Sequence, residues 1–204
     1  MGMTCTVYRA TDEEIDRLLE EPAGLVDFLD PDDGSAPRLR TVRPKGLLGL
    51  ALRLFPITIT EVVPDPRADV APRVIDRDRS VDIDKGWHGL HFLFTGTADA
   101  GEEPACYLVR GGEDLDDEGQ ARALRSDQVQ RFAEYLSTLD AAELSRRYDP
   151  ARMTSLEIYP DAIWTRRVPE EDSPREWLLE CFADLRRFIS QAAATHDGVI
   201  VHIG

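Results

Sequence analysis

The chain has 204 residues and a formal net charge of −15, with 39 acidic against 24 basic residues, and 42% of its residues are hydrophobic. This length and apolar content are typical of a single globular domain with a substantial core. The acidic balance excludes nucleic acid as an expected partner, because such a surface repels phosphate backbones and no segregated basic patch is visible. No apolar run approaches the roughly 20 residues that span a membrane, and the N-terminal stretch lacks the pattern of a signal peptide.

The cysteines indicate a reducing compartment. Cys5, Cys106 and Cys181 are odd in number and widely spaced, with no CxxC pair. Neither a zinc knuckle nor a redox dithiol is therefore predicted, and no cofactor is expected. We expect a cytoplasmic bacterial protein.

The N-terminal part predicts a strand followed by helices. Residues 3–9 alternate as a strand does, and Thr11 begins a helix with Glu14 three residues on, which is a capping box. A second short helix is predicted over 24–30.

The segment at about 30–79 is predicted to be a family-variable insertion that packs on the domain. It is rich in turn residues and prolines. Residues 47–55 favour a short helix and residues 57–63, "ITITEVV", favour a strand.

Residues 81–97, "VDIDKGWHGLHFLFTGT", predict one helix with Asp82 or Asp84 as its N-cap and Gly96 as its C-cap. Gly86 and Gly89 weaken a helix, so their presence indicates close approach of another backbone or of a ligand. A stripe at helical spacing predicts the core-facing side: Ile83, Trp87, Leu90 and Phe94.

A polar stripe lies beside this apolar one in the predicted helix and holds Asp84, His88, His91 and Thr95. Two histidines and a carboxylate at this spacing could bind a metal ion or transfer protons. Against a metal site, a third ligand must come from elsewhere, so the set of Asp84, His88 and His91 is the less favoured interpretation. The favoured one is structural, with His91 a hydrogen-bonded residue beside the core and His88 in solvent.

The C-terminal half predicts a strand, three helices and a final strand. Residues 104–112 have strand character, and the acidic run at 113–119 is predicted to be a solvated loop. Ser126, Asp140 and Ser173 stand at expected N-caps of helices, and residues 199–203, "VIVHI", form a buried strand. This order predicts the α+β class, a single compact domain over 1–204 with a mixed or antiparallel sheet and packed helices.

Glu157, Tyr159 and Asp161 surround Pro160 in the stretch "LEIYPDAIW". They could form the rim of a pocket, although a locked irregular connection is the favoured interpretation. The sequence has no GxSxG, HExxH or nucleotide-binding glycine motif.

Several pieces together resemble the YfbM-like family, a bacterial domain of unknown function (DUF1877). They are an N-terminal "GM", "DIDKGWHGLHFLFTGT", "LDAAELSRRYDPARMTSLEIYP" and the closing "VIVHIG". The resemblance implies a compact α+β domain and brings no established activity. It also implies that the position of His88 can carry an acid, which favours His91 over His88 as a functional residue. The resemblance implies that the family keeps the positions of Asp84, Lys85, Trp87, His91, Thr95, Gly96, Glu157, Tyr159 and Pro160.

Two functions are compatible with these observations. The first is a non-catalytic binding or accessory protein, such as one of the immunity type, whose acidic surface engages a basic protein partner. The alternative is a small enzyme or ligand-binding domain with a pocket of Asp84, His91, Glu157 and Tyr159, in which His91 would be the acid–base group. The lack of a complete catalytic set favours the first, and the sequence leaves the oligomeric state open.

Overall fold

The structure is a computed structural model of the chain that describes residues 2–29, 39–42, 59–62, 79–166, 169 and 172–204. Its contacts divide the chain into two units, residues 1–25 with 77–204 and residues 26–76. Most of the predicted insertion at about 30–79, including the helix expected over 47–55, lies outside the described residues, so the insertion stays a prediction.

The smaller unit contains a two-stranded antiparallel hairpin. Its strands are β2 (Leu39–Val42) and β3 (Ile59–Val62), with Leu39 paired to Val62 and Val42 to Ile59. β3 falls within the strand that the sequence predicts over 57–63.

A five-stranded antiparallel sheet in the order β4-β1-β7-β6-β5 is the centre of the larger unit. The first and last strands of the chain are neighbours in it, because Cys5 pairs with Ile203 and Ala10 with Gly198. The predicted α+β class with an antiparallel sheet is therefore confirmed. The strands are β1 (Cys5–Ala10), β4 (Ser80–Asp82), β5 (Glu113–Asp114), β6 (Ala121–Leu124) and β7 (Gly198–Ile203).

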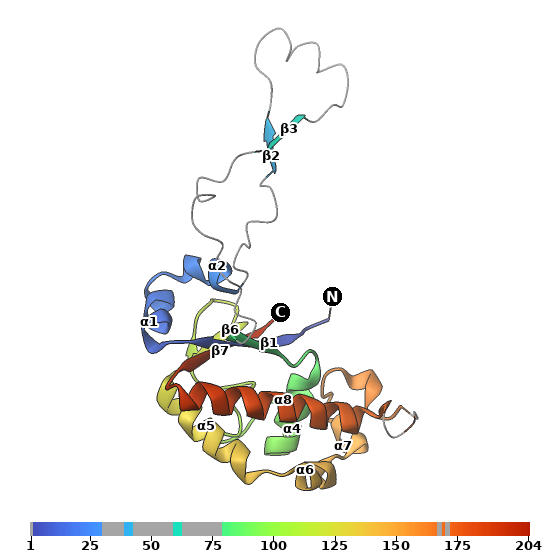
Figure 1. Cartoon of the computed structure of the whole chain (residues 1–204). Coiled ribbons are helices and arrows are strands. Elements are labelled where there is room, and N and C mark those ends of the chain that lie inside the picture. Colours follow the sequence, from blue (N-terminus) through green and yellow to red (C-terminus); the bar gives the residue numbers. More distant parts are fainter. Residues whose placement is uncertain (1, 30–38, 43–58, 63–78, 167–168, 170–171) are drawn as a thin grey trace. The chain divides into compact units, whose positions relative to one another are not determined.

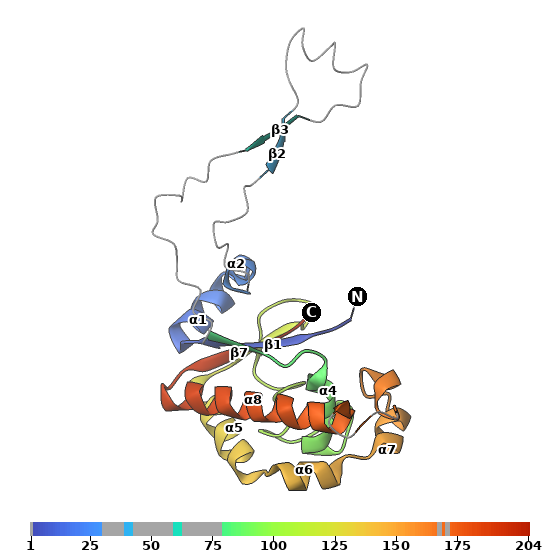
Figure 2. The ribbon, with the colours of Figure 1, turned by 45° about the vertical axis from the view of Figure 1, so that its right-hand side comes forward.

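Helices cover the two faces of this sheet unequally. In both Figure 1 and Figure 2, α1 lies on one face of the sheet and α4, α5, α6 and α8 lie on the other. The long α8 runs across the second face and contacts α4, α5 and α6. The helical elements are α1 (Asp12–Glu20), η1 (Pro22–Gly24), α2 (Leu25–Leu29), α4 (Gly86–Thr95), α5 (Ser126–Thr138), α6 (Ala141–Arg147), α7 (Pro150–Ser155), η4 (Asp161–Ile163) and α8 (Pro174–Ala194).

The central strand β7 is buried on both faces, as its unbroken apolar run predicts. Val199 and Val201 join the core shared with α8, and Ile200, which points the other way, is also fully buried. Gly198 is required by close packing, because a Cβ atom at this position would lie 2.6 Å from the backbone oxygen of Leu124 in β6 and 2.6 Å from Ile15 Cδ1 of α1.

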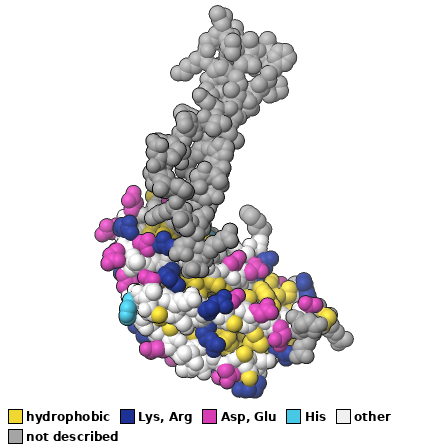
Figure 3. Space-filling view, viewed as in Figure 1, with side chains coloured by type: hydrophobic (Ala, Val, Ile, Leu, Met, Phe, Trp, Pro, Cys, Tyr) yellow, Lys and Arg dark blue, Asp and Glu magenta, His cyan; other side chains and the backbone are white. Residues whose placement is uncertain are grey.

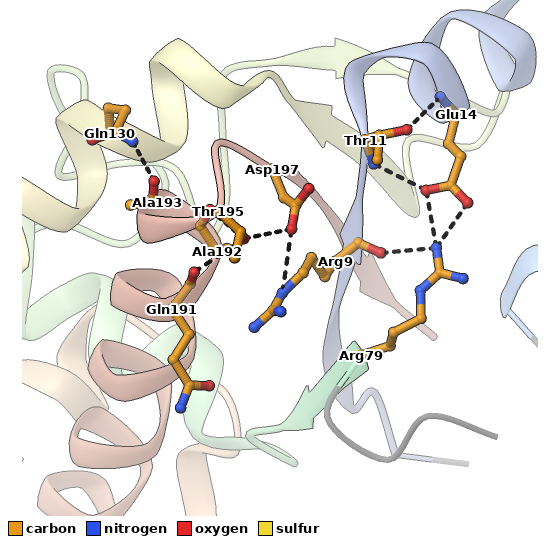
Figure 4. A network of polar contacts seen from close by, with 10 residues as sticks. All are labelled: Arg9, Thr11, Glu14, Arg79, Gln130, Gln191, Ala192, Ala193, Thr195 and Asp197. Carbon is orange, nitrogen blue, oxygen red and sulfur yellow. Dashed lines mark hydrogen bonds and ion pairs between the residues drawn. The ribbon is translucent and has the colours of Figure 1, made fainter. Parts of the chain in front are cut away.

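A polar network ties β1 to α1 and to the end of α8 (Figure 4). The predicted capping box is present, since Thr11 Oγ1 accepts from Glu14 N at 3.2 Å and Glu14 Oε2 accepts from Thr11 N at 2.9 Å. Arg79 Nη2 donates to both Glu14 carboxylate oxygens at 2.9 and 3.0 Å, and Arg9 forms an ion pair with Asp197 at 3.8 Å. These bonds fix the start of α1 against the sheet.

The expectations for residues 104–112 and for Ser126 are wrong. Residues 104–112 form consecutive turns instead of a strand, and three residues in a row, Cys106 to Leu108, are buried there. Ser126 is the first residue of α5 and not its N-cap, because its N–H and hydroxyl both donate to the Asp12 carboxylate of α1, at 3.0 and 2.7 Å.

The other predicted caps are confirmed. Asp140 Oδ1 accepts from Glu143 N at 2.6 Å, and Ser173 Oγ accepts from Glu176 N at 3.2 Å. The short strands β4, β5 and β6 were not predicted, because two to four residues give too little alternation to detect.

Candidate functional site

The candidate site is built on α4, which is shorter than predicted. Residues 80–82 are strand β4, and the helix begins only at Gly86, with Lys85 at the N-cap position and no side-chain cap. Neither Asp82 nor Asp84 caps α4. Instead Asp82 Oδ1 accepts from Asp84 N at 2.7 Å, and Asp84 takes a left-handed backbone conformation at φ 46°.

The expected core side of this segment is confirmed. Trp87, Leu90 and Phe94 are buried in α4, and Ile83 is buried just before it. Gly86 and Gly89 mark a close approach, as expected. The groups that approach them are side chains of α8 and of the segment after α7. A Cβ atom at Gly89 would lie 2.8 Å from Leu178 Cδ2 and from the Trp164 ring. Gly96 ends the helix at φ 74°, as predicted.

His88 links two loops and has no free ring nitrogen. Tyr159 N donates to Nδ1 at 2.9 Å, so Nδ1 is the acceptor and Nε2 carries the proton that it donates to Ala98 O at 2.8 Å. Burial lowers the pKa of His88, while the Ala98 carbonyl and Asp99 oppose that shift. This histidine is neutral and structural, and the expectation that it meets solvent is wrong.

His91 lies completely inside the core, at 0% exposure. Neither ring nitrogen makes a hydrogen bond of normal geometry, although the Ala100 backbone lies close enough to favour the charged ring weakly. Burial and, less strongly, the nearby His88 lower the pKa of His91 to about 4. The structural interpretation is therefore right about the core position and wrong about the hydrogen bond.

Tyr159 lies beside Lys85 and the N-terminus. A Cβ atom built on Gly2 would lie 2.7 Å from Tyr159 Oη and 2.9 Å from Lys85 Cε. The Tyr159 ring also stacks on Trp87, with ring centroids 6.1 Å apart.

The segment before Tyr159 is locked in place. Ile158 is fully buried and its carbonyl accepts from Trp164 Nε1 at 2.6 Å. Glu157 is exposed, with φ 54°. The favoured structural interpretation of this stretch, a locked irregular connection, agrees with these bonds.

The four candidate residues do not converge on one space. Asp84 and Glu157 are exposed, Tyr159 is half-buried, and His91 is inside the core. Thr95, the last member of the polar stripe, donates to His91 O at 2.8 Å and so closes the end of α4. Among the residues that the structure describes, no group of three or more His, Cys, Asp or Glu side chains could hold a metal ion.

Arg122 is a buried residue that sequence reasoning missed. It is 7% exposed, and its Nη2 and Nη1 donate to Leu108 O at 2.8 Å and Gly111 O at 3.1 Å. Burial lowers its pKa, and Cys5 and Asp114 oppose this. These bonds explain why residues 104–112 are not a strand, because a side chain satisfies their carbonyls. No pattern in "ARAL", residues 121–124, indicates that Arg122 bonds these carbonyls.

A surface of exposed carboxylates lies elsewhere on the larger unit. On α1, Glu13, Asp16 and Glu20 lie on one stripe, opposite the buried Ile15 and Leu18. Figure 3 shows Asp and Glu side chains gathered over α1.

Arg125 connects this stripe to the edge of the sheet. Its Nη1 lies 2.8 Å from Asp16 Oδ1, and its Nε donates to Glu113 Oε1 at 2.6 Å, which raises the pKa of the guanidinium. Asp114, Asp117 and Glu118 follow in β5 and the turn after it, and all three are exposed. We call this set the α1–β5 acidic surface: Glu13, Asp16, Glu20, Glu113, Asp114, Asp117 and Glu118.

The fold and the α4 segment define an α+β domain built on a mostly buried aromatic and histidine-containing helix. Residues 1–202 match the family described as a domain of unknown function (DUF1877), and the chain belongs to that family.

Two comparisons with YfbM of Escherichia coli agree with this assignment. The chain is 30% identical to protein YfbM of strain K12 over 95 residues, which is 44% of this chain and 57% of YfbM. It is also similar to the crystal structure of YfbM, a protein of unknown function, with a TM-score of 0.60 at 20% identity over 98% of this chain and 99% of that one. The structural likeness supports the fold. None of the helices in the described ranges is long and apolar enough to cross a membrane.

Proposed function

We propose that the chain is a non-catalytic binding or accessory protein, of the immunity type or similar, whose α1–β5 acidic surface engages a basic protein partner. The observation that carries the proposal is the arrangement of these carboxylates on adjacent elements. Arg125 contacts both Asp16 of α1 and Glu113 of β5, so these two carboxylates lie next to each other and link the two elements.

The charge of the chain supports this proposal. A net charge of −15 steers basic partners toward the molecule and disfavours nucleic acid. Carboxylates at the rim of an interface contribute more to association rate and specificity than to affinity. We place the protein in the cytoplasm, in keeping with the three free and buried thiols.

Capture from lysate at two salt concentrations tests the proposal. The immobilised protein should retain a basic protein from bacterial lysate at about 0.1 M salt and release it at about 1 M, where the Debye length falls from roughly 10 to 3 Å. A variant with Glu13→Gln, Glu20→Gln, Asp117→Asn and Glu118→Gln should lose most of this capture.

The matched control neutralises as many exposed carboxylates away from the surface. It carries Glu102→Gln, Glu134→Gln, Asp161→Asn and Glu180→Gln, and it should capture as the wild type does. Equal loss in both variants, or capture that salt does not affect, would contradict a role for the α1–β5 acidic surface.

The alternative is a small enzyme or ligand-binding domain that uses Asp84, His91, Glu157 and Tyr159. The observation that favours it is that the Tyr159 hydroxyl and the Lys85 side chain both lie close to Gly2. It requires the core to open, because His91 has no exposed atom in this structure. A His91→Leu variant separates the two functions: partner capture is kept if the acidic surface acts, and activity in cells is lost if His91 is the acid–base group.

A further inference from the structure

A shallow, open depression of about 360 Å³ lies on the surface between α5 and α8, and all five of its lining side chains are exposed. Four of its lining residues are spaced i, i+3, i+4 and i+7 along α8, so they form one stripe of that helix. The fifth, Ser137, comes from the end of α5. The lining is polar and contains no carboxylate and no aromatic side chain: Ser137, Ala183, Arg186, Arg187 and Ser190.

Both arginines are held in place by neighbours. The Arg186 guanidinium lies 5.2 Å from the centre of the Phe182 ring, and its Nη1 donates to Leu139 O at 3.3 Å. Arg187 Nη2 donates to Asp184 Oδ1 at 2.8 Å. A guanidinium carries five N–H donors, so each arginine keeps donors for a further acceptor.

Two positive side chains are adjacent in this region, which also holds the carboxylates of Glu180 and Asp184 on α8 and Glu134 on α5. The net charge of −15 repels anions at long range, yet two adjacent arginines line one depression. Figure 3 shows Lys and Arg side chains gathered near α8 on the face in view. Asp184 is the carboxylate that contacts this pair, and its charge is already balanced by Arg187.

We propose that this depression binds a small phosphate monoester. A phosphate monoester has two negative charges and three terminal oxygens, so it can bind two guanidinium groups at once. A ligand with a single carboxylate has one charge and two oxygens, and it matches the pair of arginines less well. The hydroxyls of Ser137 and Ser190 provide further hydrogen-bonding groups, and the volume falls at the lower end of the range for small-molecule sites. The absence of an aromatic side chain from the lining favours a phosphorylated sugar over a nucleotide, because no ring is present for a base to stack on.

A titration followed by amide NMR tests the proposal with ribose 5-phosphate, inorganic phosphate and ribose as probes. Both phosphate-containing probes should shift the signals of residues 137 and 183–190 with saturation, and ribose should not. Tighter binding of ribose 5-phosphate than of inorganic phosphate would identify a phosphomonoester site. Equal binding of these two probes would identify a site for the phosphate group alone, which still supports the anion assignment. The absence of any saturable shift overturns the proposal.

Variants on the exposed face of α8 show where the probe binds. Ala183→Glu should weaken binding of ribose 5-phosphate at least tenfold, because it places a carboxylate beside the arginines without removing any bond. The similarly sized Ala183→Gln should keep most of the binding.

A double variant with Arg186→Gln and Arg187→Gln should also weaken binding of ribose 5-phosphate at least tenfold. The control with Arg146→Gln and Arg152→Gln should not weaken it. Unchanged binding in Ala183→Glu or in the Arg186/Arg187 variant overturns the assignment of this depression. The result does not depend on the α1–β5 acidic surface, so the two proposals fail separately.

Discussion

At the scale of single residues, His91 and His88 have opposite environments. His91 is enclosed by the core with no hydrogen bond of normal geometry, whereas both ring nitrogens of His88 are bonded. A buried polar group without a partner costs stability, and charging it costs more. His91 is therefore a pH-sensitive point in the core.

We predict that the protein loses stability between about pH 6.5 and pH 4 because of His91. Its pKa in the folded state is lowered to about 4, so below pH 6.5 the unfolded chain binds the proton more readily and unfolding becomes easier as pH falls. This linkage lowers the free energy of unfolding by about 2 kcal/mol between pH 7 and pH 5. Urea unfolding at the two pH values measures it.

A His91→Leu variant should lose much of this difference, because leucine has a similar volume and does not titrate. Phe92→Leu is the control, since it removes buried volume one residue along the same helix without removing a titrating group. If His91→Leu kept the full wild-type dependence on pH, His91 would not be the group responsible.

Sequence reasoning placed both histidines on one helix and His91 next to the core, but it could not find the partners that bury and bond His88. The helical period assigns both to one side of the helix, and the decisive partners, Tyr159 N and Ala98 O, come from other segments. The same holds for Arg122, whose partners lie 14 and 11 residues earlier in the chain. Tertiary hydrogen bonds of this kind leave no local pattern.

At the scale of elements, the contact between α4 and α8 depends on Gly89. A Cβ atom there would lie 2.8 Å from Leu178 Cδ2 and 3.0 Å from Leu178 Cδ1. Such distances are too short for carbon atoms, so a larger residue must push the helices apart or displace Trp164.

We predict that Gly89→Ala destabilises the protein by up to about 2 kcal/mol. Alanine improves helix propensity by roughly 1 kcal/mol, but overpacking a tight contact costs about 1–3 kcal/mol. Gly24→Ala is the control, because a Cβ atom there would meet Leu18 Cδ2 at an ordinary 3.6 Å. Chemical denaturation of both variants gives the comparison, and a stabilised Gly89→Ala would show that α8 does not approach as closely as described.

The elements that sequence reasoning predicted well have strong local signals. The capping box at Thr11, the N-caps at Asp140 and Ser173 and the apolar run of β7 are all present. The elements that it missed or misplaced depend on partners distant in sequence. β4 takes its strand conformation by pairing with β1, for example Val81 with Val7, which is why residues 80–82 do not continue into α4.

At the scale of the whole molecule, the uneven distribution of charge is the property most relevant to binding. The carboxylates of the α1–β5 acidic surface are mainly exposed, and Arg125 holds two of them in place. A surface of this kind accelerates encounter with a basic partner, because long-range attraction acts before contact. The effect should appear in the association rate constant more than in the dissociation rate constant.

The measurement that tests this account most directly is the association rate constant for a captured partner as a function of salt. We predict that the rate constant of the wild type falls steeply between about 0.1 M and about 1 M salt as screening increases. The variant Glu13→Gln, Glu20→Gln, Asp117→Asn and Glu118→Gln should associate at least about tenfold more slowly at low salt, with dissociation changed by less than about twofold. A rate constant that is independent of salt, or a variant that associates as fast as the wild type, would contradict the assignment of binding to the α1–β5 acidic surface.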